Sequence, residues 1–202
     1  MKKIIQYCLI FCSFSLYSQQ FEVGISSGTG FAYLFENANN NVNISFHAPL
    51  VISSSLKYIP KNSNIGIKFT YQNLDAKIHG VDWQFGFNNG ETFQGSVENR
   101  TFILGIEYLK EVKKVNIGYH VGIGQTNERI NFDERGTTKV ENSFMVLNFG
   151  GLIQYAVNDK VSLSLEPSLL WNDPIKSFSN YYRLAGEDVH LLLQLGIRYK
   201  IM

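Results

Sequence analysis

The chain is poor in several features that particular classes of protein require. Its only two cysteines, Cys8 and Cys12, lie in the first 18 residues, so a disulfide framework cannot hold the rest together. Its 18 Lys and Arg balance 17 Asp and Glu. With no basic cluster, this balance excludes nucleic-acid binding through a strong positive field. No apolar run reaches the ~18 residues of a spanning helix, which excludes a helical membrane protein.

The first 18 residues have the pattern of an export signal. Lys2 and Lys3 precede a mostly apolar stretch, and Ser18 supplies a small residue next to a plausible cleavage point. We therefore expect residues 1–18 to be removed on export and residues 19–202 to form a single domain. An exported domain without disulfides must obtain its stability in another way.

The remaining chain shows repeated alternation of apolar and polar residues with period two, which predicts strands. The expected strands are 21–33, 44–59, 64–74, 95–110, 115–126, 141–157, 160–171 and 188–201. The first, third, fifth and seventh connections between them are long, and the other three are short. This parity predicts an all-β fold, an eight-stranded antiparallel up-and-down transmembrane β-barrel with short periplasmic turns and long external loops.

Side-chain alternation predicts which face of this barrel meets lipid. One face of each strand is large and apolar, and the other is rich in Gly, Ser and a few charged residues, which suits a narrow, filled interior. Aromatic residues of the apolar face are expected in two rings: Phe21, Tyr58, Tyr108, Tyr155 and Tyr199 near the termini, and Phe31, Phe46, Phe102, Phe144 and Trp171 opposite. The alternatives are that Tyr is simply a common strand residue, or that a soluble lipocalin-like barrel turns its apolar faces inward.

The final strand carries the most specific pattern. The segment 194–201, Gln-Leu-Gly-Ile-Arg-Tyr-Lys-Ile, resembles the C-terminal signal of the small eight-stranded outer-membrane barrels, a family that includes the transmembrane domain of outer-membrane protein A. This resemblance covers residues 19–202 and implies insertion by the outer-membrane assembly machinery into the outer membrane of a Gram-negative cell. It also implies that the protein contacts outer-membrane lipid.

Seven charged residues fall on the inward parity: Glu22, Lys57, Lys68, Glu107, Glu166, Arg198 and Lys200. Buried charges are costly unless they are paired, so we expect a salt-bridge network that plugs the lumen. Glu22 and Arg198 should pair across the closing seam, and Lys57 and Glu107 should lie at similar heights. The network is interpreted as structural packing, with an ion gate as the alternative.

Three histidines, His47, His120 and His190, are also expected to face inward. Because no spacing motif joins them, we interpret them as hydrogen-bonded interior residues rather than metal ligands. The serines of strand 160–171 have no neighbouring histidine in the sequence, and phosphate-binding glycine loops are missing. The sequence therefore predicts no catalytic residues, no metal and no cofactor.

The long loops are the expected site of contact with a partner, such as another envelope protein. The 75–94 connection and the last long loop contain exposed aromatic residues and an arginine, which are typical of recognition surfaces. The candidate residues are Trp83, Phe85, Phe87, Phe178, Tyr181, Tyr182 and Arg183. The 127–140 connection is expected to be a solvated charged tip. The expected role is structural or interactive, with a small gated pore and a lipid-modifying enzyme as alternatives.

Overall fold

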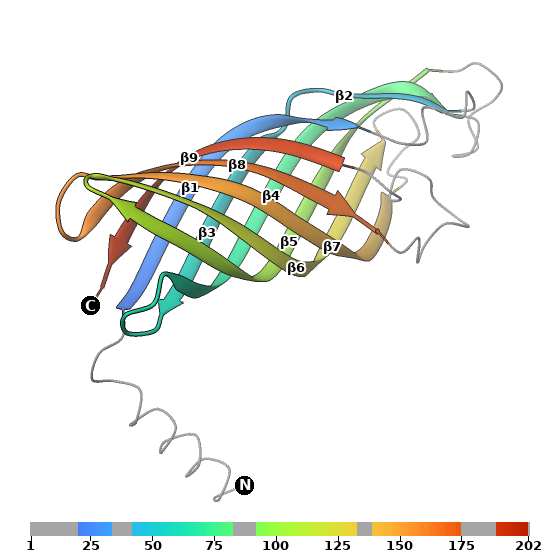
Figure 1. Cartoon of the computed structure of the whole chain (residues 1–202). Coiled ribbons are helices and arrows are strands. Elements are labelled where there is room, and N and C mark those ends of the chain that lie inside the picture. The colour runs from blue at the N-terminus through green and yellow to red at the C-terminus, as the bar shows by residue number, and fades with distance from the viewer. Residues whose placement is uncertain (1–19, 34–41, 83–91, 133–138, 175–188, 202) are drawn as a thin grey trace, which may run out of the picture.

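A computed structural model of the chain describes residues 20–33, 42–82, 92–132, 139–174 and 189–201. They form one closed antiparallel sheet (Figure 1). Its strands are β1 (Gln20–Tyr33), β2 (Val42–Phe46), β3 (Leu50–Ile59), β4 (Ile65–Asp82), β5 (Thr92–Val112), β6 (Val115–Phe132), β7 (Lys139–Ala156), β8 (Val161–Asn172) and β9 (Val189–Lys200). The described residues include no helix that is long and apolar enough to cross a membrane.

The strands are joined in an up-and-down order. From β3 to β9, each strand pairs with the next one along the chain, and β1 pairs with both β3 and β9. These pairings close the barrel. β2 and β3 both pair with β4 and together form one interrupted strand, called a stave here, so the nine labelled strands make a barrel of eight staves. The predicted eight-stranded antiparallel barrel is therefore confirmed.

The stave made of β2 and β3 is interrupted by a bulge. Phe46 pairs with Ile78 and Leu50 pairs with Asp75, so three residues on one side face two on the other. A bulge shifts the side-chain alternation by one residue, and His47 is consequently exposed while Phe46 packs against the interior. The predictions of an inward His47 and an outward Phe46 were wrong, because unbroken alternation had been assumed through the bulge.

The strands β4 to β7 are longer than the sequence pattern predicted. The segments 75–94 and 127–140 were expected to be loops, yet the described parts of both continue the strands. Alternation also continues here, but the polar residues now face outward and the apolar residues inward. The sequence prediction required apolar residues on the outer face, and it therefore ended these strands too early.

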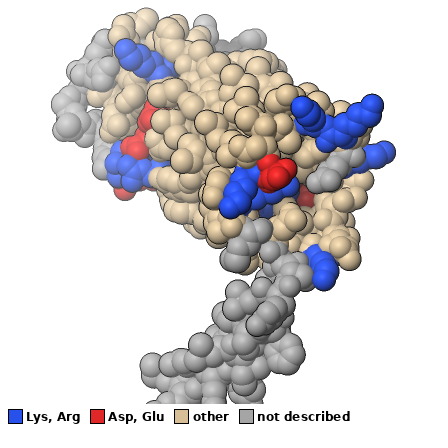
Figure 2. Space-filling view, turned by 90° about the vertical axis from the view of Figure 1, so that its left-hand side faces the viewer, with Lys and Arg blue, Asp and Glu red and all other residues tan. Residues whose placement is uncertain are grey.

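The three short turns lie at the end of the barrel that also holds the C-terminus (Figure 1). Asn62 and Lys113 occupy these turns with positive φ angles of 57° and 60°. In the third turn, Asn158 Oδ1 accepts hydrogen bonds from the backbone N–H groups of Lys160 and Val161, as turn asparagines commonly do. Figure 2 views this end, where Lys and Arg side chains are separated by largely uncharged surface.

Candidate functional site

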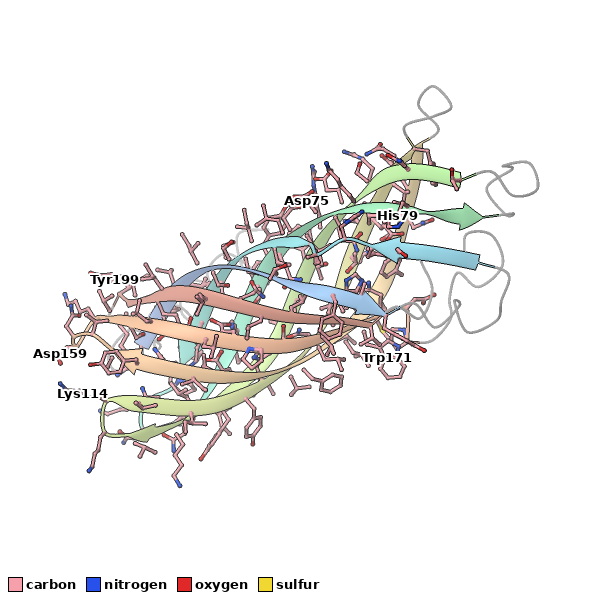
Figure 3. All side chains as sticks on the ribbon, turned by 90° about the horizontal axis from the view of Figure 1, so that it is seen from above. Asp75, His79, Lys114, Asp159, Trp171 and Tyr199 are labelled. Carbon is pink, nitrogen blue, oxygen red and sulfur yellow. The ribbon has the colours of Figure 1, made fainter. Side chains whose placement is uncertain are left out.

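The outer surface of the barrel carries a broad apolar belt. Ile25 and Leu195 are each 69% exposed, and large apolar residues of every stave lie on the same face. Near the termini the belt contains aromatic pairs, with ring centroids 5.4 Å apart for Phe21 and Tyr58 and 5.3 Å apart for Tyr108 and Tyr119. Figure 3 shows Tyr199 toward this end and Trp171 toward the opposite one.

The second aromatic ring is less complete than predicted. Phe31, Phe102 and Trp171 are exposed on the outer face, as expected. Phe144 is only 3% exposed and lies inside the barrel. It shares its parity along β7 with the buried residues Asn148 and Gln154, so its assignment to the outer ring was wrong.

The apolar and polar faces exchange sides at one level of the barrel. On β6 the outward residues are apolar up to Ile123 and polar from Gln125, while the inward residues change from glycine to Ile130 and Phe132. The same exchange falls after Tyr71 on β4, before Phe102 on β5 and before Met145 on β7. These positions are close neighbours in the strand register: Tyr71 pairs with Phe102, Phe102 with Gln125, and Gln125 with Met145.

This exchange is expected where the surroundings of the outer face change from lipid to water. Lipid favours apolar side chains on the outer face of a barrel, whereas water favours polar ones there and an apolar interior. The belt therefore has a sharp upper limit, and β4 to β7 continue past it as a polar-surfaced extension, defined here as residues 73–82, 92–100, 125–132 and 139–143.

Six of the seven predicted inward charges meet inside the barrel, near the end with the short turns. The ionic cluster consists of Glu22, Lys57, Lys68, Glu107, Glu166 and Arg198. All six are at most 9% exposed. The seventh, Lys200, is half-buried at the end of β9 and is not part of this cluster.

Arg198 and Glu107 form the centre of the ionic cluster. Arg198 Nη1 lies 3.1 Å from Glu22 and 2.8 Å from Glu107, and its Nη2 lies 2.9 Å from Glu166. The expected seam pair, Glu22 with Arg198, is therefore present. Glu107 also binds Lys57 at 2.6 Å, as its height suggested, and Lys68 at 3.2 Å. Three cations face three carboxylates, so the cluster is electrically balanced.

A polar layer follows the ionic cluster along the lumen. Gln194 accepts hydrogen bonds from Ser53 at 2.7 Å and from Ser26 at 3.1 Å. A cavity of about 20 Å³ lies beside these groups, and His120, Ser168 and Glu166 also line it. It has room for about one water molecule.

Several interior polar atoms of this region have no partner among the described residues. They are Gln72 Nε2, His120 Nδ1, both ring nitrogens of His190 and both amide atoms of Asn172. No described protein group hydrogen-bonds to His120 Nδ1 or to the ring nitrogens of His190, so the expected hydrogen bonding of these histidines stays a prediction. Buried polar groups of this kind normally bind ordered water.

Beyond the polar layer, the described interior of the barrel is lined by apolar residues. Val51, Leu74, Ala76 and Leu192 form one buried cluster, against which Phe46 packs. Ile103, Val146 and Leu170 form a second buried cluster. The sequence prediction missed this layer, since apolar residues of the inward parity are sparse until the faces exchange.

Charged residues cover the outside of the extension. Arg129 lies 3.6 Å from Glu98 and 3.2 Å from Glu141, and Arg100 lies 2.6 Å from Glu98. These residues line a surface hollow of about 340 Å³. Partial burial and the carboxylate of Glu98 raise the pKa of Asp75, and Arg100 opposes them.

Glu128 differs from its neighbours because it points into the extension and is 3% exposed. It had been expected in a solvated loop, which was wrong. Asn142 donates a hydrogen bond to it at 3.3 Å. Burial raises the pKa of Glu128 to about 7, although hydrogen bonds from Asn142 and Asn99 oppose the shift.

A metal centre and the predicted loop surface are two further kinds of candidate site. The described residues contain no group of three or more His, Cys, Asp or Glu side chains placed to hold a metal ion. The predicted loop surface lies outside the described residues. Its members are Trp83, Phe85, Phe87, Phe178, Tyr181, Tyr182 and Arg183.

The fold of this chain is similar to those of several solved outer-membrane proteins. A major outer membrane protein from Thermus thermophilus matches with a TM-score of 0.62 and 13% identity. Neisserial surface protein A matches with a TM-score of 0.58 and 13% identity, and Ail of Yersinia pestis with 0.55 and 11%. Each match covers 92% of this chain and 100% of the other. No family model and no curated protein matches the sequence.

The chain therefore has the fold of the small eight-stranded outer-membrane β-barrels. The apolar belt on its outer face agrees with a transmembrane barrel.

Proposed function

We propose that this protein is an integral outer-membrane protein with a structural or interaction role and a lumen closed to ions. The observation that carries the proposal is the exchange of faces, since an outer surface that is apolar up to one level and polar beyond it suits a barrel set in a membrane. It also favours this reading over a soluble lipocalin-like barrel, which would keep its outer surface polar throughout. Export through the signal at residues 1–18 and insertion by the outer-membrane assembly machinery are parts of the same proposal.

Two layers support a closed lumen. Any ion would have to displace the ionic cluster, in which every charge has a partner, and then cross the apolar layer. Buried apolar constrictions oppose ions because they cannot replace the water that an ion loses. Conduction would require both layers to open.

The extension supports an interaction role. It carries four strands past the belt and displays charged side chains on its outer face. Two structural neighbours are called a surface protein and an attachment invasion locus protein, and we propose a comparable role at the cell surface here. The aromatic loop residues named above are the proposed contacts with another envelope protein.

The first experiment compares unheated and boiled protein from the outer-membrane fraction on a gel. A closed barrel should migrate differently before and after boiling, and it should remain in the membrane fraction. Absence of the shift, with the protein in the soluble periplasm, would overturn the membrane assignment. The folded protein is then placed in planar bilayers, where we expect no steady channel current.

A gated pore is the second candidate, and one observation favours it. Glu107 and Glu166 each bind more than one cation, so ion pairs can be exchanged without leaving a charge unpaired. Steady current through correctly folded wild-type protein would support the pore and contradict the closed lumen.

We also propose that the barrel is not an enzyme. Ser168, His120 and Glu166 share one cavity, but its volume of about 20 Å³ is far below the ~300 Å³ or more of typical small-molecule sites. Lipid hydrolysis that is lost in a Ser168→Ala variant would contradict this part of the proposal.

A further inference from the structure

Two of the four histidines of this chain lie side by side on the outer face of the barrel. The ring centroids of His47 and His79 are 4.9 Å apart, with 42° between the ring planes. Both residues are exposed. His79 lies at the end with the long connections (Figure 3), about 26 Å along β4 beyond Tyr71 at ~3.3 Å per residue, and hence beyond the apolar belt.

The bulge between β2 and β3 creates this pair. Regular alternation would turn His47 toward the lumen, whereas the extra residue turns it outward, beside His79. The backbone N–H of His47 donates to the carbonyl of Lys77 at 2.9 Å, which fixes His47 next to the strand that carries His79. Bulges are often found where a functional side chain has to be redirected.

Two exposed imidazoles at this separation are close enough for both to reach one metal ion. Imidazole nitrogen is a good ligand for Zn²⁺, Ni²⁺ and Cu²⁺, and Cu²⁺ binds most tightly in that series. Ser45 pairs with His79 across β2 and β4 and is exposed, which places a hydroxyl on the same face as a weak third donor. Because the pair is open to solvent, water can complete the coordination.

We propose that His47 and His79 bind one divalent transition-metal ion on the surface of the extension, with Cu²⁺ held more tightly than Zn²⁺. The two imidazoles hold the ion, with the Ser45 hydroxyl as a weak third donor, so its remaining positions are open to water or to a ligand from outside. This inference does not depend on the proposed function, because it concerns neither the lumen nor the aromatic loops.

The test measures the affinity of detergent-folded protein for Cu²⁺ and for Zn²⁺ in two separate calorimetric titrations. Wild-type protein should bind one ion at this site, and His47→Asn and His79→Asn should each weaken binding by roughly 100-fold, because two linked attachment points become one. The double variant, which retains neither imidazole, should show no binding at this site. The boiling-dependent gel shift confirms that each variant is folded.

His120→Asn is the matched control, since His120 lies in the lumen, and it should leave the affinity unchanged. Cys8 and Cys12 lie in the proposed export signal, and because they are the same in all variants, any thiol contribution from uncleaved protein cancels in the comparison. Equal affinity in wild type and His47→Asn, or loss of binding only in His120→Asn, would overturn the proposal. Tighter binding of Zn²⁺ than of Cu²⁺ would overturn it as well.

Discussion

Arg198 and Glu107 form a bidentate ion pair. Nη1 of Arg198 donates to one carboxylate oxygen of Glu107 at 2.8 Å, and Nη2 donates to the other at 3.1 Å. Such two-point pairs between guanidinium and carboxylate are among the strongest hydrogen-bonded contacts in proteins. The same carboxylate binds Lys57 and Lys68. Glu107 is therefore the shared anion of three cations that come from three other strands.

Replacing Glu107 should be the most damaging change in the ionic cluster. Glu107→Gln keeps the shape but leaves three buried cations without their common anion, and we expect a loss of about 3–5 kcal/mol in the free energy of unfolding. Glu22→Gln should cost less, because Glu22 forms an ion pair only with Arg198 within this cluster. Urea unfolding from lipid vesicles measures both variants.

The double variant Glu107→Gln with Lys57→Met is the control for this prediction. It removes one of the cations that lost its carboxylate partner, so it should recover part of the lost stability. An equal effect of Glu22→Gln and Glu107→Gln would show that Glu107 is not the centre of the cluster.

The lipid-facing assignment can be tested at Leu195. This residue is 69% exposed and lies in the middle of the outward apolar residues of β9, so Leu195→Arg should cost about 2–4 kcal/mol, as a charge near the bilayer midplane does. Ser96→Arg is the control, because Ser96 is exposed on β5 within the extension. Vesicle unfolding should separate the two variants, and equal small effects would contradict a lipid belt around β9.

Within the belt, alternation alone was enough to predict the barrel. Residues such as Val115, Ile117 and Tyr119 face outward as expected because lipid imposes one preference on every strand there. Above Ile123 the preference reverses, and a rule built on outward apolar residues could not follow β6 beyond it. The bulge at 47–49 escaped prediction for a different reason, since it depends on pairing with β4 rather than on local sequence.

The ionic cluster was predictable in membership but not in arrangement. Parity along each strand identified Glu22, Lys57 and Arg198, and closure of the barrel paired Glu22 with Arg198. The central place of Glu107 depends on distances across the lumen, which a one-dimensional pattern does not contain. The same limit explains why the pairing of His47 with His79 was missed.

Gly150 should not tolerate a side chain. A Cβ atom there would overlap the His120 ring and lie 2.9 Å from the carbonyl oxygen of Pro167, so Gly150→Ala should cost about 1–3 kcal/mol through overpacking. Adding His120→Ala should relieve part of this cost. Gly151→Ala is the neighbouring control, because its nearest contact would be Pro167 Cγ at 3.3 Å. Urea unfolding of these three variants and the wild type measures the losses, and similar losses at both glycines would contradict the role of His120.

Glu128 should make the stability of the protein depend on pH near neutrality. The folded protein holds the Glu128 proton up to a pKa of about 7, whereas the unfolded chain releases it near the ordinary value of 4.5. Between these pH values the folded state binds more protons, so its stability falls as the pH rises from about 4.5 to about 7. The fall attributable to this residue is at most about 3 kcal/mol.

Glu128→Gln should remove that fall, because the amide keeps the size of the side chain and has no proton to lose. The wild type and the variant should therefore differ least near pH 4.5, with the variant gaining relative stability up to about pH 7 and a constant advantage beyond it. Glu141→Gln is the control, since the Glu141 side chain is 59% exposed on the same extension and should not alter the slope. Urea unfolding at several pH values measures all three proteins. Parallel curves for wild type and Glu128→Gln would mean that Glu128 releases its proton in the folded protein at its ordinary pKa and that burial imposes no cost on its charge.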